Sequence, residues 1–291
     1  MSKRVRTAVF PAGGLGTRFL PATKVIPKEM LALVDKPIIQ YGVEEAIASG
    51  IEHIIIITGR GKAAMEDHFD HSFELDATLE MRGKKELLAV SRGVSALARI
   101  SYVRQKEPLG LGHAVLCAKH LVGDEPFAVL LPDDVIDAEV PCLKQMIDVF
   151  DEKGGSVIAT QTIDGPSISA YGVLAGSQDP ENPRIYNCTG MVEKPKFVDA
   201  PSNQAIIGRY VLTPRVFALL EETTPGAGGE IQLTDGIKTL LKEEEVYGYT
   251  FEGKRFDAGD KFGMLQAMVE FALKREDLGP QFRAYLKGLE L

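Results

Sequence analysis

A glycine-rich segment near the N-terminus has the composition of a phosphate-binding loop. Residues 11–18 read Pro-Ala-Gly-Gly-Leu-Gly-Thr-Arg, and Lys28 follows ten residues later. The glycines leave backbone N–H groups uncovered, so phosphate oxygens can approach, and Arg18 and Lys28 add positive charge. The first 28 residues hold six Lys or Arg and no Asp or Glu, although the whole chain has a formal net charge of −8. This local positive field suits a small polyanion, whereas the acidic remainder disfavours nucleic acid.

Two other nucleotide-binding loops do not fit this segment. A P-loop requires the pattern GxxxxGK[ST], which is absent, and a dinucleotide-binding fingerprint requires a long helix directly after the glycines. Asp35 lies where a ribose-binding acid would be expected in the second case. However, Pro21 and Pro27 would each remove a backbone donor and clash with the preceding turn, so no crossover helix can run through this stretch. Nicotinamide-linked oxidoreduction is therefore disfavoured.

Polar side chains also follow two apolar strands that we expect farther along the chain. Asp133 and Asp134 come at the end of the strand expected at 127–132, where open α/β sheets place their ligands. Such carboxylates suit Mg²⁺, which takes one or two of them together with phosphates and water, although Asp134 fits a polar turn or a helix cap equally well. Gln105 ends the strand expected at 100–105, and its amide complements the N3–H donor and O4 acceptor of uracil. Taken alone, a glutamine at this place is more often a solvated strand end.

The order of apolar runs predicts an α/β fold. Runs that can be buried on both faces predict strands at 6–10, 53–58, 100–105 and 127–132. We expect a helix at 37–49 that ends before Gly50, and a polar, helix-prone excursion at 62–94. This alternation is typical of a Rossmann-like, mostly parallel sheet flanked by helices.

The second half of the chain has a different order of predicted strands and helices. Strands are expected at 156–161, 171–175, 186–193, 205–212 and 246–251, helices at 214–222 and 230–244, and a helical segment at 261–289. Because these strands lack full crossover helices, we expect part of the sheet to be mixed or antiparallel. No Pro/Ser-rich linker separates the halves, which favours a single domain.

The cysteines and the apolar stretches indicate the compartment. Cys117, Cys142 and Cys188 form no metal-binding spacing, and we interpret them as core residues in a reducing environment. No apolar stretch approaches the about 18 residues that span a bilayer, and the run after the basic start is too short for a signal peptide. We therefore expect a cytoplasmic protein without a membrane partner.

Several motifs together resemble the sugar-1-phosphate nucleotidyltransferases. The entry signature of that family is similar to Gly-Gly-Leu-Gly-Thr-Arg at 13–18 followed by Pro-Lys-Glu-Met at 27–30. Further similar segments lie at 19–24, 35–41, 69–74, 110–115, 229–235 and 256–260. The resemblance implies one nucleotidyltransferase domain over 1–291. Its parts would bind nucleotide at about 1–135 and sugar phosphate at about 136–260, followed by C-terminal helices at 261–291.

The resemblance also implies a role for each candidate site residue. The residues implied in nucleotide binding are Ala12, Gly13, Gly14, Gly16, Gln105 and Gly110, of which the last two take the pyrimidine. Those implied in sugar-phosphate binding are Tyr171, Gly172, Glu193 and Lys194. Asp133 and Asp257 would hold Mg²⁺, and the catalytic cations would be Arg18, Lys28 and Lys194. Arg209 fits either a ligand contact or an interface position.

The activity implied is Mg²⁺-dependent, direct in-line transfer of UMP from UTP to α-D-glucose 1-phosphate, giving UDP-glucose and pyrophosphate. A sugar phosphate is already anionic at neutral pH, so no general base is required, and the protein must align two mutually repelling anions. The alternatives are transfer from dTTP and a nucleotide-sensing module without catalysis. Such a module would have lost Lys28, Asp133 or Lys194, and all three are present. The resemblance further suggests a homodimer or homotetramer, with 62–94 as a candidate contact surface.

Overall fold

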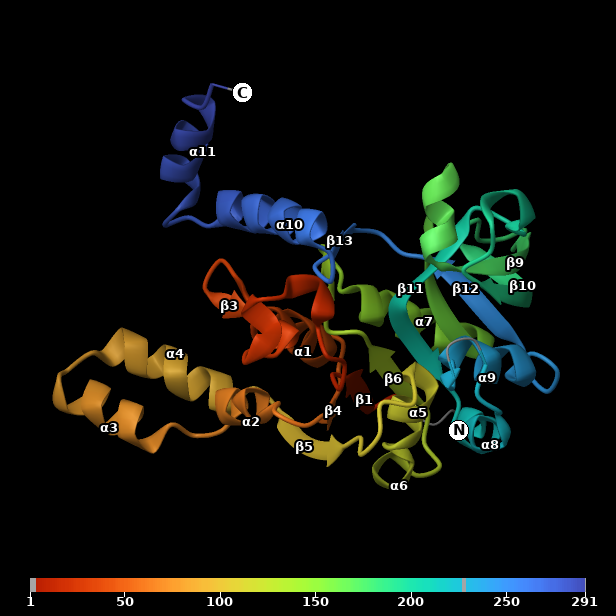
Figure 1. The fold of residues 1–291 in the computed structure, drawn as a ribbon, viewed down its shortest axis with the longest axis horizontal. Helices are drawn as coiled ribbons and strands as arrows, with labels where there is room; N and C mark the ends of the chain where they lie inside the picture. The colour runs from red at the N-terminus through yellow and green to blue at the C-terminus, as the bar shows by residue number, and fades with distance from the viewer. Residues whose placement is uncertain (1–3, 227–228, 291) are drawn as a thin grey trace.

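The computed structural model describes residues 4–226 and 229–290. Within these residues, a mixed sheet of nine strands forms the centre of the fold (Figure 1). In spatial order the strands are β5 (Arg99–Arg104), β4 (His53–Thr58), β1 (Thr7–Pro11), β6 (Phe127–Leu130), β11 (Gln204–Leu212), β8 (Ser156–Thr162), β12 (Val246–Thr250), β10 (Ile185–Glu193) and β9 (Gly172–Gln178). The four consecutive isoleucines of β4 are fully buried, because both faces of the sheet are covered.

The direction of pairing changes across the sheet. Strands β5, β4, β1 and β6 are parallel to one another, as expected for βα units. β11 runs antiparallel to both β6 and β8, β12 is parallel to β8, and the last two pairings are antiparallel. β9 also pairs with β11, so the second half is partly closed. The expected mixed α/β sheet is confirmed. The expectation of a mostly parallel sheet is wrong beyond β6, because turns and short 3₁₀ helices connect several of the later strands.

Two helical layers cover the sheet, and alternate residues of β1 point into them. Ala8 and Phe10 belong to the apolar cluster that includes α1 (Ile38–Ala48) and α7 (Cys142–Lys153). Val9 belongs to the cluster on the other face, which includes α5 (Leu111–Leu116), α8 (Arg215–Glu222) and α9 (Leu233–Leu240). This period of two is the property of a strand buried on both faces. The short helix α6 (Lys119–Val122) follows α5.

The helix-prone excursion between β4 and β5 projects from the edge of the sheet. It consists of α2 (Ala63–Phe69), α3 (Phe73–Met81) and α4 (Lys85–Ser95). Figure 1 shows α3 and α4 as a hairpin that extends away from the sheet. The expected helical insertion is therefore confirmed.

Two short antiparallel ribbons lie outside the main sheet, and the sequence analysis does not anticipate them. β7 (Asp134–Asp137) pairs with β13 (Lys254–Asp257), and β2 (Ala32–Leu33) pairs with β3 (Lys36–Pro37). The register of the first ribbon places Asp134 directly opposite Asp257. Distant segments of the chain thus meet at this ribbon.

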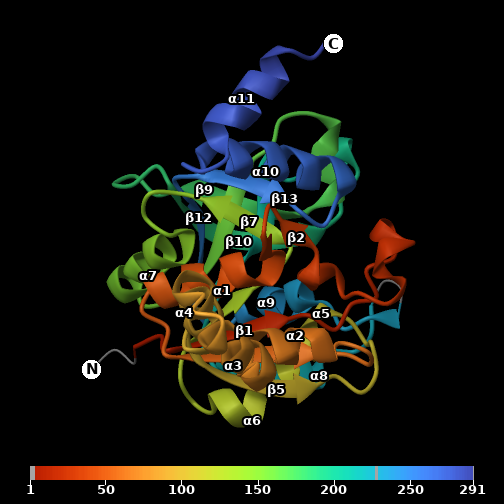
Figure 2. The same ribbon diagram turned by 90° about the vertical axis from the view of Figure 1, so that its left-hand side faces the viewer.

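The C-terminal segment, in which the sequence predicts helices at 261–291, forms two helices. α10 (Lys261–Lys274) packs over the ribbons through a separate apolar cluster, and α11 (Gly279–Lys287) continues outward (Figure 2). Short 3₁₀ helices complete the structure at Thr17–Phe19, Ala22–Lys24, Lys28–Met30, Pro166–Ala170 and Phe197–Asp199. No helix in the described part of the chain has both the length and the apolar character that a membrane span requires.

Candidate active site

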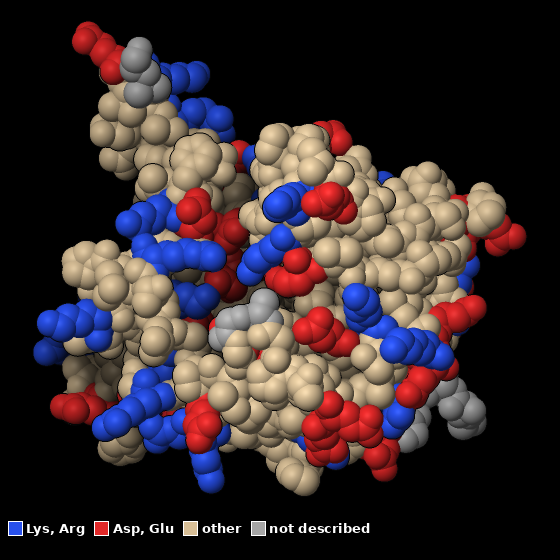
Figure 3. Space-filling view, turned by 45° about the vertical axis from the view of Figure 1, so that its right-hand side comes forward, with Lys and Arg blue, Asp and Glu red and all other residues tan. Residues whose placement is uncertain are grey.

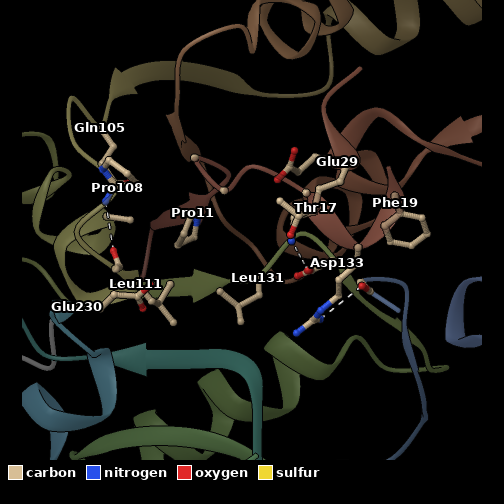
Figure 4. A pocket seen from close by; sticks show the side chains of 18 residues that line it. Pro11, Thr17, Phe19, Glu29, Gln105, Pro108, Leu111, Leu131, Asp133 and Glu230 are labelled. Carbon is tan, nitrogen blue, oxygen red and sulfur yellow. Dashed lines mark hydrogen bonds and ion pairs between the residues drawn. The ribbon is translucent and has the colours of Figure 1, made fainter. Parts of the chain in front are cut away.

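A cavity of about 500 Å³ opens at the carboxyl ends of β1, β5 and β6. Its lining combines the glycine-rich segment with polar side chains of other elements. The lining residues are Pro11, Gly13, Gly14, Gly16, Thr17, Arg18, Phe19, Lys28, Glu29, Gln105, Pro108, Gly110, Leu111, Ala114, Leu131, Asp133, Glu230 and Gly259. In Figure 4, Gln105 and Asp133 lie on opposite sides, with Pro11 and Leu131 between them. The position agrees with the edge at which open α/β sheets bind their ligands.

The glycine-rich segment forms one wall of this larger cavity. The Ala12 N–H donates to the carbonyl of Ile57, which holds the start of the segment to the sheet. Gly16 has φ 65°, in the left-handed region that favours glycine. A Cβ at Gly13 would lie 2.7 Å from Oε1 of Gln105. The backbone therefore passes close to the end of the Gln105 side chain, which would have to move if Gly13 carried a Cβ.

Gln105 and Gly110 lie together at one end of the cavity. The backbone N–H of Gln105 donates to Thr58, and its side-chain Nε2 donates to the Gly110 carbonyl at 3.2 Å. The same Nε2 lies 2.9 Å from Nδ1 of His113, a neighbour that the sequence analysis does not identify. Gly110 has φ 104°, and a Cβ there would lie 2.7 Å from the carbonyl oxygen of Ile231. The structure thus brings together the two residues expected to take a pyrimidine.

Lys28 and Asp133 form an ion pair on the other side of the cavity, with Nζ 2.5 Å from Oδ2. Burial acts to lower the pKa of Lys28, but the adjacent Asp133 carboxylate outweighs it and the pKa is raised. Burial acts to raise the pKa of Asp133, but Lys28 outweighs it and the pKa is lowered. Both groups therefore remain charged at neutral pH.

The two carboxylates expected to hold a metal converge on Gly259. A Cβ there would lie 2.6 Å from Oδ2 of Asp133 and 3.1 Å from Oδ1 of Asp257. Arg18 reaches the same place, since its Nη1 donates to the Gly259 carbonyl at 3.5 Å. Among the residues that the structure describes, no group of three or more His, Cys, Asp or Glu side chains is arranged as a metal site. Two carboxylates at the edge of this cavity nevertheless fit Mg²⁺, which completes its ligands with phosphates and water.

A smaller cavity of about 180 Å³ adjoins the larger one, and Leu111 and Leu131 line both. Its lining includes Tyr171, Gly172 and Glu193, which the sequence analysis assigns to sugar-phosphate binding. The Thr234 hydroxyl donates to Oε2 of Glu193 at 3.1 Å. A carboxylate beside hydroxyl and backbone groups is suited to bind sugar hydroxyls.

Lys194 lies outside the lining of both cavities. Its φ of 45° is unusual for a residue with a Cβ, and its side chain is 65% exposed. Nζ lies 3.5 Å from Oε1 of Glu193, and the backbone N–H donates to the Tyr171 carbonyl. The structure therefore places Lys194 next to the smaller cavity, with its ammonium group directed to Glu193.

Arg209 and Asp134 have structural contacts. The Arg209 side chain is fully buried, pairs with Glu45 at 2.8 Å and donates to the carbonyls of Leu131 and Asp134. Neither a ligand contact nor an interface position fits this burial. Asp134 is buried as well, accepts a hydrogen bond from the Gly208 N–H, and its pKa is raised by burial.

Some charged residues around the cavities have no role in the sequence analysis. Glu29 lines the larger cavity and forms a buried ion pair with Lys62 at 2.6 Å. Its other oxygen, Oε1, has no hydrogen-bond partner among the described residues. Arg255 lines the smaller cavity. A signal for Arg255 is present, because it stands two residues before Asp257 in a segment that alternates charged and apolar residues.

Charged side chains of both signs gather around a hollow on one face of the molecule. Figure 3 shows Lys and Arg side chains along this hollow, with acidic side chains deeper inside it.

Comparison with known proteins finds relatives that extend over nearly the whole chain. Residues 7–276 match the protein family described as nucleotidyl transferase. The UTP–glucose-1-phosphate uridylyltransferase of Bacillus subtilis strain 168 is 52% identical over 289 residues, which cover 99% of this chain and 98% of that protein. A UTP-bound UGPase from Acinetobacter baumannii is 42% identical with a TM-score of 0.90, covering 98% of this chain and 100% of that one. A UDP-glucose pyrophosphorylase in complex with UDP-glucose is 44% identical with a TM-score of 0.84, covering 93% and 100%.

Proposed function

Because this chain belongs to the nucleotidyl transferase family, we propose that it transfers UMP from UTP to α-D-glucose 1-phosphate, giving UDP-glucose and pyrophosphate. Two adjoining cavities support this assignment, since a transfer reaction must hold both substrates with the reacting atoms about 3–3.5 Å apart. The larger cavity has a glycine-rich wall and cations, and the smaller one contains Glu193. Relatives that match nearly the full length are named for this reaction.

In this proposal the larger cavity binds UTP. Gln105 and Gly110 receive the uracil edge, and the backbone of Ala12, Gly13, Gly14 and Gly16 faces the rest of the nucleotide. A thymine base has the same hydrogen-bonding edge and differs by a methyl group at C5. Space for one methyl group is worth about 1–3 kcal/mol, so dTTP would be a poorer substrate and not an excluded one.

The smaller cavity would bind glucose 1-phosphate. Tyr171 and Gly172 form one side, and the Glu193 carboxylate accepts hydrogen bonds from sugar hydroxyls. Lys194 would move its exposed ammonium group from Glu193 to the incoming phosphate, a displacement that a flexible four-carbon stem permits.

The reaction needs alignment more than proton transfer. The phosphate oxygen of glucose 1-phosphate attacks the α-phosphorus of UTP, a new P–O bond forms, and the bond to the leaving pyrophosphate breaks. Arg18 and Lys28 hold the nucleotide phosphates and stabilise the negative charge that grows on pyrophosphate, while Lys194 offsets the repulsion between the two anions. The nucleophile is already ionised, so no residue has to remove a proton.

Asp133 and Asp257 would hold Mg²⁺ in this site. When bound, the ion supplies positive charge to phosphate oxygens. The two carboxylates flank Gly259, next to the phosphate-binding cations. The negative charge of Asp133 is offset by its ion pair with Lys28, and Arg18 lies nearby at the Gly259 carbonyl.

We further propose that residues 1–291 act as one domain, with nucleotide bound at about 1–135, sugar phosphate at about 136–260 and helices at 261–291. The shared lining of the two cavities supports a single unit. We propose a cytoplasmic homodimer or homotetramer, in which residues 62–94 contribute a contact surface. The free cysteines fit a reducing compartment, and the exposed Phe73, Met81 and Val90 of the excursion fit a contact between copies.

A pyrophosphate-release assay over the four common nucleoside triphosphates, dTTP and several sugar 1-phosphates tests this function. We expect the highest kcat/KM for UTP with glucose 1-phosphate. Faster turnover with dTTP would replace the assignment by a thymidylyltransferase. Binding of UTP without pyrophosphate release from any pair would favour a nucleotide sensor.

The stereochemistry of transfer tests the mechanism separately. One direct in-line displacement inverts the configuration at a chiral α-phosphorothioate of UTP. Retention would require an even number of displacements and would contradict direct transfer.

A further inference from the structure

One arginine, Arg255, contacts a residue assigned to the metal and a residue assigned to the sugar phosphate. It lies on β13, which pairs with β7 so that Asp257 faces Asp134. Arg255 and Asp257 are two positions apart on a strand and therefore project from the same side of the ribbon. The Arg255 side chain is 9% exposed. One side of the ribbon thus brings a guanidinium between two carboxylates.

The guanidinium contacts three partners with different atoms. Its Nε and Nη2 each lie 2.5 Å from Oδ1 of Asp134, and Nη2 lies 3.6 Å from Oδ2 of Asp257. Its Nη1 donates to the Tyr171 hydroxyl at 3.3 Å, and the guanidinium carbon lies 5.3 Å from the centroid of that ring. Opposed carboxylates in a ribbon repel each other, and the planar fork of arginine can neutralise both while it binds a third group. Arg255 therefore contacts Asp257 and Tyr171 at the same time.

Arg255 lines the smaller cavity, which shares Leu111 and Leu131 with the larger one. Asp134 and Tyr171 line the smaller cavity as well. Asp133, adjacent to Asp134 in the chain, lines the larger cavity with Lys28. A displaced guanidinium would therefore shift Tyr171 and the smaller cavity relative to the groups that line the larger one.

We propose that Arg255 is a positioning residue that fixes the sugar phosphate relative to the nucleotide by holding Asp257 and Tyr171 in one network. This inference rests on the proposed function and adds a residue to its site. The reaction has no covalent intermediate and no general base in that mechanism, so its rate depends on alignment. A displacement of about 1 Å can lower a rate by about 100-fold.

The variant R255K tests this role, because lysine keeps the charge but has no planar fork. We expect kcat/KM for glucose 1-phosphate to fall by about 100-fold, while the KM for UTP stays near its wild-type value. Calorimetric titration with UDP-glucose in the presence of EDTA gives a readout without turnover or metal, and we expect weaker binding. Y171F removes one partner of the guanidinium, and we expect a smaller loss in the same constants. R215K is the matched control, since Arg215 forms an exposed two-bond pair with Glu243 and lines neither cavity.

The possible outcomes test the positioning role of Arg255 separately from the proposed function. Wild-type constants and wild-type UDP-glucose affinity in R255K would overturn the positioning role. Equal losses for both substrates together with a lower melting temperature would show a structural role only, and would also overturn it. A wild-type protein that forms no UDP-glucose would contradict the proposed function alone, because the UDP-glucose titration would still support or contradict the role of Arg255.

Discussion

The ammonium group of Lys28 lies 2.5 Å from Oδ2 of Asp133, although 105 positions separate the two residues in the chain. Burial acts to neutralise each group, and the pairing reverses the pKa shift of both. The pair therefore keeps a cation at the wall of the larger cavity in the absence of a ligand. A triphosphate that enters the cavity would compete with Asp133 for this cation.

Loss of the Lys28 charge should slow transfer more than it weakens binding. We expect K28A to lower kcat by on the order of 10²-fold or more, because the charge that develops on the leaving pyrophosphate loses a donor. Steady-state kinetics of pyrophosphate release measures the effect. K119A is the control, since Lys119 forms a surface pair with Glu221 and lines neither cavity. Wild-type turnover in K28A would contradict the proposed role of Lys28 in the transfer step.

The backbone at Gly110 should not tolerate a methyl group. In G110A the new Cβ would meet the Ile231 carbonyl at 2.7 Å, and φ 104° is unfavourable for alanine. We expect a raised KM for UTP, because the movement that relieves this contact displaces the neighbouring Gln105 side chain. G93A is the control: a Cβ there meets no atom within 4 Å, and alanine at this helical position should stabilise α4 by up to about 1 kcal/mol. An unchanged KM in G110A would argue that the base does not lie at this end of the cavity.

The sequence predicts elements whose burial is local and continuous. The isoleucine run of β4 predicts a strand at 53–58, and the structure has it with these bounds. Helix α7 is not among the elements predicted from the sequence. Its buried residues, such as Leu143, Met146 and Phe150, nevertheless follow helical spacing, so the pattern that indicates it is present. The β7–β13 ribbon is different, because its strands have four residues each and 121 positions separate Arg255 from Asp134. Pairing at such a distance depends on the whole fold.

The geometry of the site also depends on contacts between distant segments, which the sequence does not predict. The residue types and the resemblance name Gln105, Gly110, Asp133 and Asp257, and the structure brings them to the larger cavity or its edge. The direction of the Lys194 side chain follows from a backbone conformation at φ 45°, which no local pattern predicts. Spacing along the chain therefore identifies candidate chemistry, and the tertiary fold decides which groups face each other.

The buried ion pair between Lys62 and Glu29 should support the wall that carries Lys28. K62M would leave the Glu29 carboxylate buried without a partner, and we expect a loss of about 3–5 kcal/mol in the free energy of unfolding. Urea denaturation followed by circular dichroism measures this loss. In K36M the partly exposed pair with Glu44 is broken instead, and the loss should not exceed about 1 kcal/mol. Equal effects of the two variants would show that burial of the Glu29 pair has no special importance.

The cysteines should resist alkylation in the folded protein. Burial raises the pKa of the Cys188 thiol to about 12, and it also raises the pKa of Cys117 and Cys142. The thiolate is the reactive form, so labelling of Cys188 by iodoacetamide should be slow at pH 8. Its rate should rise about tenfold for each unit by which the pH is raised, up to about pH 12. A raised thiol pKa favours the folded state below the ordinary value of 9.0, and this contribution is lost as pH rises through about 12. Peptide mapping by mass spectrometry measures the rates, with protein in urea as the reference. Equal rates in folded and unfolded protein at pH 8 would contradict the shift.

The carboxylate of Asp257 should set the requirement for Mg²⁺. D257N keeps the shape of the side chain but removes a charged oxygen ligand, so we expect the Mg²⁺ concentration for half-maximal activity to rise by at least about tenfold. Binding of Mn²⁺ in the presence of UTP, followed by electron paramagnetic resonance, should weaken in parallel and does not require turnover. D148N serves as the control, because Asp148 lies on the exposed surface of α7 and pairs with Lys144. An unchanged metal requirement in D257N would show that Asp257 does not bind the ion. Full activity of the wild-type protein after chelation would show that the reaction does not need Mg²⁺.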